Sequence, residues 1–259
     1  WNDVLRGDSG DDQLFGNDGN DYLAGGSDSD NLKGGAGNDR LRGQGGSGDR
    51  LTGGAGADNL DGGAGNDILE ELIEGDLRMY RDRYETPERG RVRNFERVFL
   101  YGTDGDNRID LSGYTVESVV SIFGGAGRDT IIGTPGPDHI VTTCCDSDGG
   151  DVIEGRAGND TIATASGHDE IRGGEGDDSI HAGAGNDTIN GGPGNDSIDG
   201  SLGNDAISGY TGDDTISGGS GSDLFSGSDT LIGHDGADLL AGSGGDDTLV
   251  GGGGTSIEG

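Results

Sequence analysis

Large aliphatic residues recur along the chain at intervals of nine, and each lies two residues after an aspartate. In the first 69 residues the aliphatic residue is always leucine, at Leu5, Leu14, Leu23, Leu32, Leu41, Leu51, Leu60 and Leu69. A second run starts at Asp129 and continues to Asp247, with one step of 13 residues and one of 6. Chance does not keep this register over so many copies, so the chain is built from internal repeats.

The best-formed units, at residues 34–42 and 191–199, read G-G-x-G-x-D-x-U-x, where U is a large aliphatic residue. Glycine at positions one, two and four permits backbone angles that other residues avoid, so positions one to six predict a tight turn. Asn or Asp at position five is expected to tolerate a left-handed conformation. The last three positions predict a short strand with U on one face.

Two nonapeptides would bring the chain back to its starting side. The pattern therefore predicts a flattened solenoid whose coils stack about 4.8 Å apart, as parallel strands do. Leucine and isoleucine would fill its interior, and aspartate-bearing turns would line its two edges.

Composition indicates that this apolar interior is too small to hold the fold alone. Glycine supplies 60 of the 259 residues, only 28% are hydrophobic, and the net charge is −34. Burying one Leu or Ile per repeat contributes roughly 2–3 kcal/mol, whereas ordering nine residues costs about 1–2 kcal/mol each. Carboxylates about 5 Å apart also repel by ~1 kcal/mol in water. We therefore expect the metal-free chain to be unfolded or molten, and cations to bridge the carboxylates.

Calcium is the cation that suits these residues. It takes 6–8 hard oxygen ligands from carboxylates and main-chain carbonyls, whereas Mg²⁺ requires a small octahedron. Zinc and copper prefer His and Cys, which number only 4 and 2 here. Multiple ions are expected, since 17 divalent ions would cancel the net charge of −34. The candidate ligands are the position-six aspartates: Asp12, Asp21, Asp30, Asp39, Asp49, Asp58, Asp67, Asp129, Asp138, Asp151, Asp160, Asp169, Asp178, Asp187, Asp196, Asp205, Asp214, Asp223, Asp238 and Asp247.

These nonapeptides resemble the RTX repeats of secreted bacterial proteins, over roughly residues 1–69 and 123–250. The resemblance implies an all-β fold, a right-handed parallel β-roll or β-solenoid with two repeats per coil. It also implies that each Ca²⁺ lies between same-side turns of adjacent coils, held by position-six carboxylates and turn carbonyls. Export of an unfolded chain, followed by folding in millimolar extracellular calcium, is a further implication of the resemblance.

The repeats predict three blocks. Residues 1–69 and 123–259 are two β-roll blocks, and residues 70–122 combine an arginine-rich excursion with degenerate, metal-poor coils. Residues 70–101 hold 7 of the 16 basic residues. Within them we expect a helical turn at 70–74 and a β-excursion over 77–84 and 91–101. The arginines either dock an acidic or polysaccharide partner or pair with neighbouring acids.

Two irregularities interrupt the blocks. Asn107 takes the aspartate position of a degenerate repeat. The 13-residue step is an insertion that carries Cys144 and Cys145, which either form a strained vicinal disulfide or remain free thiols.

Several function classes are disfavoured. The negative charge argues against nucleic acid as a partner, and no run approaches the ~18 apolar residues of a membrane span. The N-terminal residues lack a signal-peptide layout. The sequence contains neither H-E-x-x-H nor G-x-S-x-G, so we expect no catalytic residue.

The sequence thus predicts a calcium-binding structural module of a secreted or cell-surface bacterial protein. Two alternatives remain open: an extracellular fibre, adhesin or surface-layer subunit that assembles end to end, and an accessory module of an exported hydrolase or epimerase. The expected partners are calcium ions and either a second copy, another cell-surface protein or a polysaccharide.

Overall fold

The computed structural model describes residues 1–73, 76–80, 83–85, 91–114, 119–142, 150–227, 229–232, 239–242, 248–250 and 256–258. All regular elements in these ranges are strands. The chain divides into two compact units, unit 1 with residues 1–102 and 110–122, and unit 2 with residues 103–109 and 123–259. Among the described residues there is no helix with the length and apolar character that a membrane span requires.

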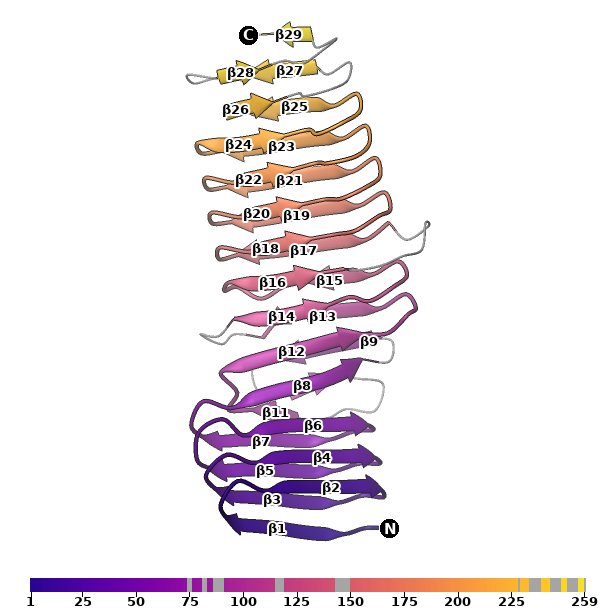
Figure 1. The fold of residues 1–259 in the computed structure, drawn as a ribbon, viewed down its shortest axis with the longest axis vertical. Helices are drawn as coiled ribbons and strands as arrows, with labels where there is room; N and C mark the ends of the chain where they lie inside the picture. The colour runs from indigo at the N-terminus through magenta and orange to yellow at the C-terminus, as the bar shows by residue number, and fades with distance from the viewer. Residues whose placement is uncertain are drawn as a thin grey trace. The chain divides into compact units, whose positions relative to one another are not determined.

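In unit 1 successive strands alternate between two parallel sheets (Figure 1). The first sheet has the order β1 (Val4–Ser9), β3 (Tyr22–Ser27), β5 (Arg40–Gly45), β7 (Asn59–Ala64) and β11 (Arg91–Arg93). The second has the order β2 (Gln13–Asp18), β4 (Asn31–Ala36), β6 (Arg50–Ala55), β8 (Ile68–Ile73), β12 (Arg97–Gly102) and β14 (Val120–Phe123). Beside them β10 (Arg83–Glu85) pairs antiparallel with β9 (Asp76–Tyr80), and β9 neighbours β13 (Arg108–Gly113).

Unit 2 repeats the same alternation. One of its sheets orders β15 (Thr130–Ile132), β17 (Val152–Ala157), β19 (Glu170–Glu175), β21 (Thr188–Pro193), β23 (Ala206–Thr211), β25 (Leu224–Gly227), β27 (Leu239–Gly242) and β29 (Ser256–Glu258). The other orders β16 (Asp138–Val141), β18 (Thr161–Ala163), β20 (Ser179–His181), β22 (Ser197–Asp199), β24 (Asp214–Ser217), β26 (Asp229–Ile232) and β28 (Thr248–Val250).

The interior of each unit contains a ladder of one aliphatic residue type. In unit 1 Leu23 pairs with Leu41, and Leu41 with Leu60; in unit 2 Ile171 pairs with Ile189. Most of these side chains are at most 2% exposed. The paired leucines of unit 1 and isoleucines of unit 2 lie two repeats apart, which confirms the predicted β-solenoid with two nonapeptides per coil.

The turns differ from the sequence-based expectation in one respect. Positive φ angles occur at positions two and four, as at Gly35 (113°) and Gly37 (135°), and not at the position-five residues Asn38 and Asn186. The strands also extend into the glycines, since β5 continues to Gly45. The expectation of a left-handed Asn at position five was therefore wrong, and that residue has another role, described below.

The predicted helical turn at residues 70–74 is also wrong, because β8 spans Ile68–Ile73 as a strand. Strands β9 to β12 confirm the β character expected for residues 77–84 and 91–101, within the described residues. Cys144, Cys145, Asp238 and Asp247 lie outside the described residues. The block boundaries at residues 69 and 122 stay predictions.

Candidate metal sites

The position-six aspartates form two buried rows in each unit. Every described candidate ligand except Asp12 is at most 6% exposed. In each row, Oδ1 accepts a hydrogen bond from the backbone N–H of the corresponding residue one coil earlier, at 2.6–3.1 Å, as in Asp21 N–H to Asp39 Oδ1 and Asp160 N–H to Asp178 Oδ1. The fold thus brings the predicted ligands into these rows, or files, and each coil contributes one carboxylate to each file.

The second carboxylate oxygen of these aspartates is buried and has no hydrogen-bond partner. This applies to Oδ2 of Asp12, Asp21, Asp30, Asp39, Asp49, Asp67, Asp129, Asp160, Asp178, Asp187, Asp196 and Asp205. Leaving a buried acceptor unsatisfied costs about 1–3 kcal/mol, and more for a charged group. A repeated orphan oxygen in the same chemical position indicates a missing electropositive partner.

The first glycine of each turn keeps space open beside that oxygen. A Cβ on Gly34 would lie 2.6 Å from the carbonyl oxygen of Gly53 and closer still to Oδ2 of Asp39. In unit 2, Gly173 relates in the same way to Asp178 and to the carbonyl of Gly191. Two oxygen acceptors from adjacent same-side turns therefore face one small space that only glycine leaves free.

Burial disfavours the ionised form of these carboxylates. Desolvation raises the pKa of Asp129, Asp160, Asp187 and Asp196 to about 7, although backbone N–H groups oppose the shift. A carboxylate in the same file adds to the increase, as Asp138 does for Asp160. A bound cation would supply the missing favourable interaction of the charged form.

The donor set fits calcium. It consists of carboxylate and carbonyl oxygens, which are the hard ligands that Ca²⁺ prefers. No group of three or more His, Cys, Asp or Glu side chains within the described ranges could hold a metal ion, so carbonyl oxygens must complete each site. The position-six carboxylates of adjacent coils, with the turn carbonyls, are the groups that would hold the ions.

A second ladder, which the sequence reasoning missed, runs through position five. The side chain there accepts the N–H of position five in the next same-side turn, as in Asn20 Oδ1 from Asn38 (2.8 Å) and Asn186 Oδ1 from Asn204 (2.9 Å). His168 Nδ1 takes the same role toward Asn186 at 2.7 Å. The preference for Asn and Asp at this position provided the signal, because both offer a short acceptor arm.

In some turns of unit 2, protein groups satisfy the side-chain oxygens at position six. Asn107 Oδ1 accepts the N–H of Thr103 at 2.7 Å, and its Nδ2 donates to the carbonyl of Gly105 at 2.7 Å. Thr134 donates its N–H to Oδ2 of Asp138 at 2.6 Å and its hydroxyl to Oδ1 at 3.0 Å. Asp138 is therefore a poorer candidate ligand than the other aspartates of its file.

In unit 1 a glutamate ends one row of turns. Glu71, at position one of its repeat, accepts the N–H groups of Gly53 (3.0 Å) and Gly54 (2.8 Å). Burial raises the pKa of Glu71 to about 8, and the carboxylate of Asp58 contributes. The carboxylate of Glu71 therefore lies against the turn that begins at Gly53, one coil earlier. Glu71 itself occupies the position at which a regular repeat has its first glycine.

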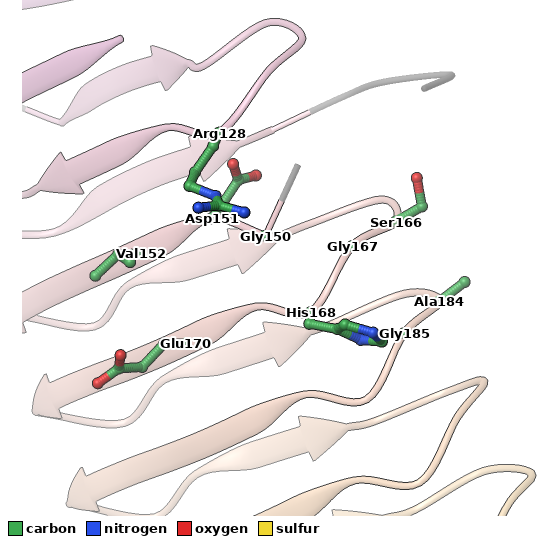
Figure 2. A pocket seen from close by; sticks show the side chains of 10 residues that line it. All are labelled: Arg128, Gly150, Asp151, Val152, Ser166, Gly167, His168, Glu170, Ala184 and Gly185. Atoms are coloured by element: carbon green, nitrogen blue, oxygen red, sulfur yellow. The ribbon is translucent and has the colours of Figure 1, made fainter. Parts of the chain in front are cut away.

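A hollow of ≈ 720 Å³ lies along one turn edge of unit 2, and Figure 2 shows its lining residues. Arg128 and His168 take position five in their turns, while Asp151 belongs to the aspartate file. Burial raises the pKa of Asp151, and the nearby Arg128 opposes that shift. The hollow thus contains one candidate ligand with a protein cation beside it.

The comparisons with known proteins agree with this geometry. The profile of the RTX calcium-binding nonapeptide repeat matches residues 2–32, 24–47, 45–70, 121–142, 146–179, 164–198, 190–225 and 225–257. The comparison with curated proteins found no significant match. Since the matched segments cover most of the chain, this protein belongs to the family of RTX calcium-binding nonapeptide repeat proteins.

Proposed function

We propose that the chain is a calcium-dependent structural module of a secreted or cell-surface bacterial protein, and that it folds when it meets extracellular calcium. The observation that carries this proposal is the file of buried Oδ2 atoms without hydrogen-bond partners. Calcium between adjacent turns would neutralise these carboxylates, and its binding free energy would become folding free energy. Extracellular modules bind calcium at about 10⁻⁴–10⁻³ M, so the fold would form outside the cell and not in the cytosol.

The test is far-ultraviolet circular dichroism of the full chain, titrated with CaCl₂ from a calcium-free buffer. We expect a cooperative gain of β structure with calcium and little gain with MgCl₂ at the same concentration. Full β structure in the calcium-free buffer would contradict the proposal. The repeats would contribute structure and ion binding, and we assign them no catalytic step.

A second candidate function is attachment to an anionic polysaccharide through the outer face of sheet β1-β3-β5-β7-β11. Within the described residues, Arg6 and Arg42 have no ion-pair partner, although the chain carries a net charge of −34. Arg40 stacks over the ring of Tyr22 at 5.8 Å. Arg40, Arg42 and Arg93 line a hollow of ≈ 450 Å³, in which Arg93 is paired with Asp61 at 2.6 Å.

The spacing of this basic face suits an extended polymer. Arg6, Arg42 and Arg93 share one side-chain row on alternate strands, and two strand spacings amount to about 9.6 Å. Polygalacturonate binding in calcium should weaken in the variant Arg40→Gln/Arg42→Gln and persist in Arg172→Gln of unit 2. Equal binding by the wild type and both variants would rule out this candidate function. End-to-end assembly stays a prediction.

A further inference from the structure

One row of aspartates in unit 1 continues into a segment without a nonapeptide. The row contains Asp12, Asp30, Asp49 and Asp67. The next same-side turn consists of only Asn94, Phe95 and Glu96, three residues in place of six. The family profile matches up to residue 70 and resumes at residue 121, so this segment lies outside it.

The strands on both sides of this short turn keep the repeat register. Strand β11 pairs with β7 through Val92 and Leu60, and β12 pairs with β8 through Val98 and Leu69. Val92 and Val98 are fully buried, as the aliphatic residues of true repeats are. Residues 91–98 are therefore a shortened coil in structure, although their sequence is not a repeat.

Glu96 occupies the place of the aspartate in this coil. Its Oε2 accepts the N–H of Asp67 at 2.8 Å, just as Oδ1 of Asp67 accepts the N–H of Asp49 at 3.1 Å. The carbonyl of Asp67 accepts the N–H of Arg97 at 3.2 Å, as the carbonyl of Asp49 accepts that of Ile68 at 2.7 Å. The longer glutamate arm compensates for the shorter turn.

Asn94 supplies the carbonyl that the first glycine supplies elsewhere. A Cβ on Gly62 would meet the carbonyl oxygen of Asn94 first and would lie 2.9 Å from Oδ2 of Asp67. In the preceding turn, Gly43 relates in the same way to the carbonyl of Gly62 and to Oδ2 of Asp49. Asp67 is fully buried, and its Oδ2 has no hydrogen-bond partner.

We propose that Asp67, the carbonyl of Asn94 and Glu96 form an additional calcium site, in which a non-repeat segment closes the end of the row. The proposal rests on the proposed function, since the ion is the one that the repeats would bind. Oδ2 of Asp67 and the carbonyl of Asn94 face one space beside Gly62, and the N–H of Asp67 holds the carboxylate of Glu96 next to Asp67. Water and turn carbonyls would complete the 6–8 ligands of calcium. Glu96 would then be a calcium ligand outside any nonapeptide.

Calcium stoichiometry of the full chain, measured by equilibrium dialysis, tests the assignment. Glu96→Gln should bind one ion fewer than the wild type, whereas Glu70→Gln, which removes the same charge from a glutamate paired with Arg50, should bind the wild-type number. Asp67→Asn and the double variant Asp67→Asn/Glu96→Gln should bind equal numbers, because Glu96 cannot hold its ion without Asp67. A wild-type count in Glu96→Gln, or a further loss in the double variant, would overturn the proposal.

A crystal structure of the wild type grown with calcium gives an answer that does not depend on whether the variants fold. We expect an ion at about 2.3–2.6 Å from oxygens of Asp67, Asn94 and Glu96. Ions in the neighbouring turns with none at Glu96 would refute this site and leave the proposed function intact. If the wild type binds no calcium at all, the proposed function itself fails.

Discussion

At the scale of the residue, one carboxylate performs two separate tasks. Oδ1 of Asp178 accepts the N–H of Asp160 at 2.8 Å and so joins adjacent coils. Oδ2 is buried without a hydrogen-bond partner and faces the space beside Gly173. An amide in place of the carboxylate would keep the first task and lose most of the second. The two contributions can therefore be separated experimentally.

We expect Asp178→Asn to raise the calcium midpoint of folding roughly tenfold, which corresponds to about 1.4 kcal/mol. Its neighbour Asp177 provides the matched control, because it lies at position five, is exposed, and accepts the N–H of Asn195 at 2.8 Å through an oxygen that Asn also has. Asp177→Asn should leave the midpoint nearly unchanged. Equal midpoints for the two variants in a circular dichroism titration would show that Oδ2 binds no ion.

The glycine at position one is required for space and not for its backbone angles. Gly34 has no positive φ, yet a Cβ there would lie 2.6 Å from the carbonyl of Gly53. We expect Gly34→Ala to cost about 1–3 kcal/mol, since the close packing cannot give way without moving the turn. At Gly45 a Cβ would meet nothing within 4 Å, so Gly45→Ala should stay within about 0.5 kcal/mol. Urea unfolding in saturating calcium measures both, and equal losses would contradict this account.

At the scale of the element, the buried carboxylate of each turn needs an electropositive partner, which can be an ion or a hydrogen-bond donor of the protein. In most of the described turns Oδ2 has no hydrogen-bond partner, but Thr134 closes the turn of Asp138 with its N–H and hydroxyl. The same hydroxyl accepts the N–H of Gly136 at 3.1 Å. In this turn hydrogen bonds of the protein do the work that calcium would do in the others.

Thr134→Val should therefore lower the free energy of unfolding by about 1–3 kcal/mol, because it leaves buried polar groups unsatisfied. Thr134→Ser keeps the hydroxyl and should lose only the burial of one methyl group, about 0.8 kcal/mol. Chemical unfolding at saturating calcium compares the two variants. A Val variant as stable as the Ser variant would mean that the hydroxyl does not stabilise the turn.

The sequence could predict those elements in which spacing alone determines contact. The interval of nine placed Leu41 and Leu60 in one core ladder and Asp39 and Asp58 in one file, because a constant period gives every coil the same register. It could not predict that Glu96 takes the place of a position-six aspartate, because the turn before Glu96 is three residues shorter and the acid is a glutamate. The overlooked signal in the sequence is Glu96-Arg97-Val98, which matches the D-x-U pattern with glutamate in place of aspartate.

Position five shows a different limit. Asn and Asp are favoured both in left-handed turns and as acceptors for backbone N–H groups. Composition cannot distinguish these two reasons, and the described structure supports the second one at Asn38 and Asn186. The element was therefore predicted correctly and its physical cause was not.

At the scale of the whole molecule, the net charge of −34 and the buried files are two aspects of one problem. Each coil adds carboxylates that are stable only when something neutralises them. In the proposed function calcium would do so at neutral pH, and protons can do so in its absence. This competition makes the stability of the fold depend on pH in opposite directions with and without calcium.

Burial raises the pKa of Asp129, Asp160, Asp187 and Asp196 in the calcium-free fold to about 7, from about 3.9 in an unfolded chain. Between about pH 4 and 7 the folded chain therefore binds more protons than the unfolded chain. The stabilisation from these protons is complete below about pH 4 and is lost as the pH rises through 7. In buffer stripped of calcium, we expect more β structure at pH 5 than at pH 8, measured by circular dichroism.

With calcium the order reverses, because protons compete with the ion for the same oxygens. The calcium midpoint of folding should therefore be higher at pH 5 than at pH 8. A calcium-free spectrum and a calcium midpoint that are both independent of pH would show that these carboxylates are not the groups on which folding depends.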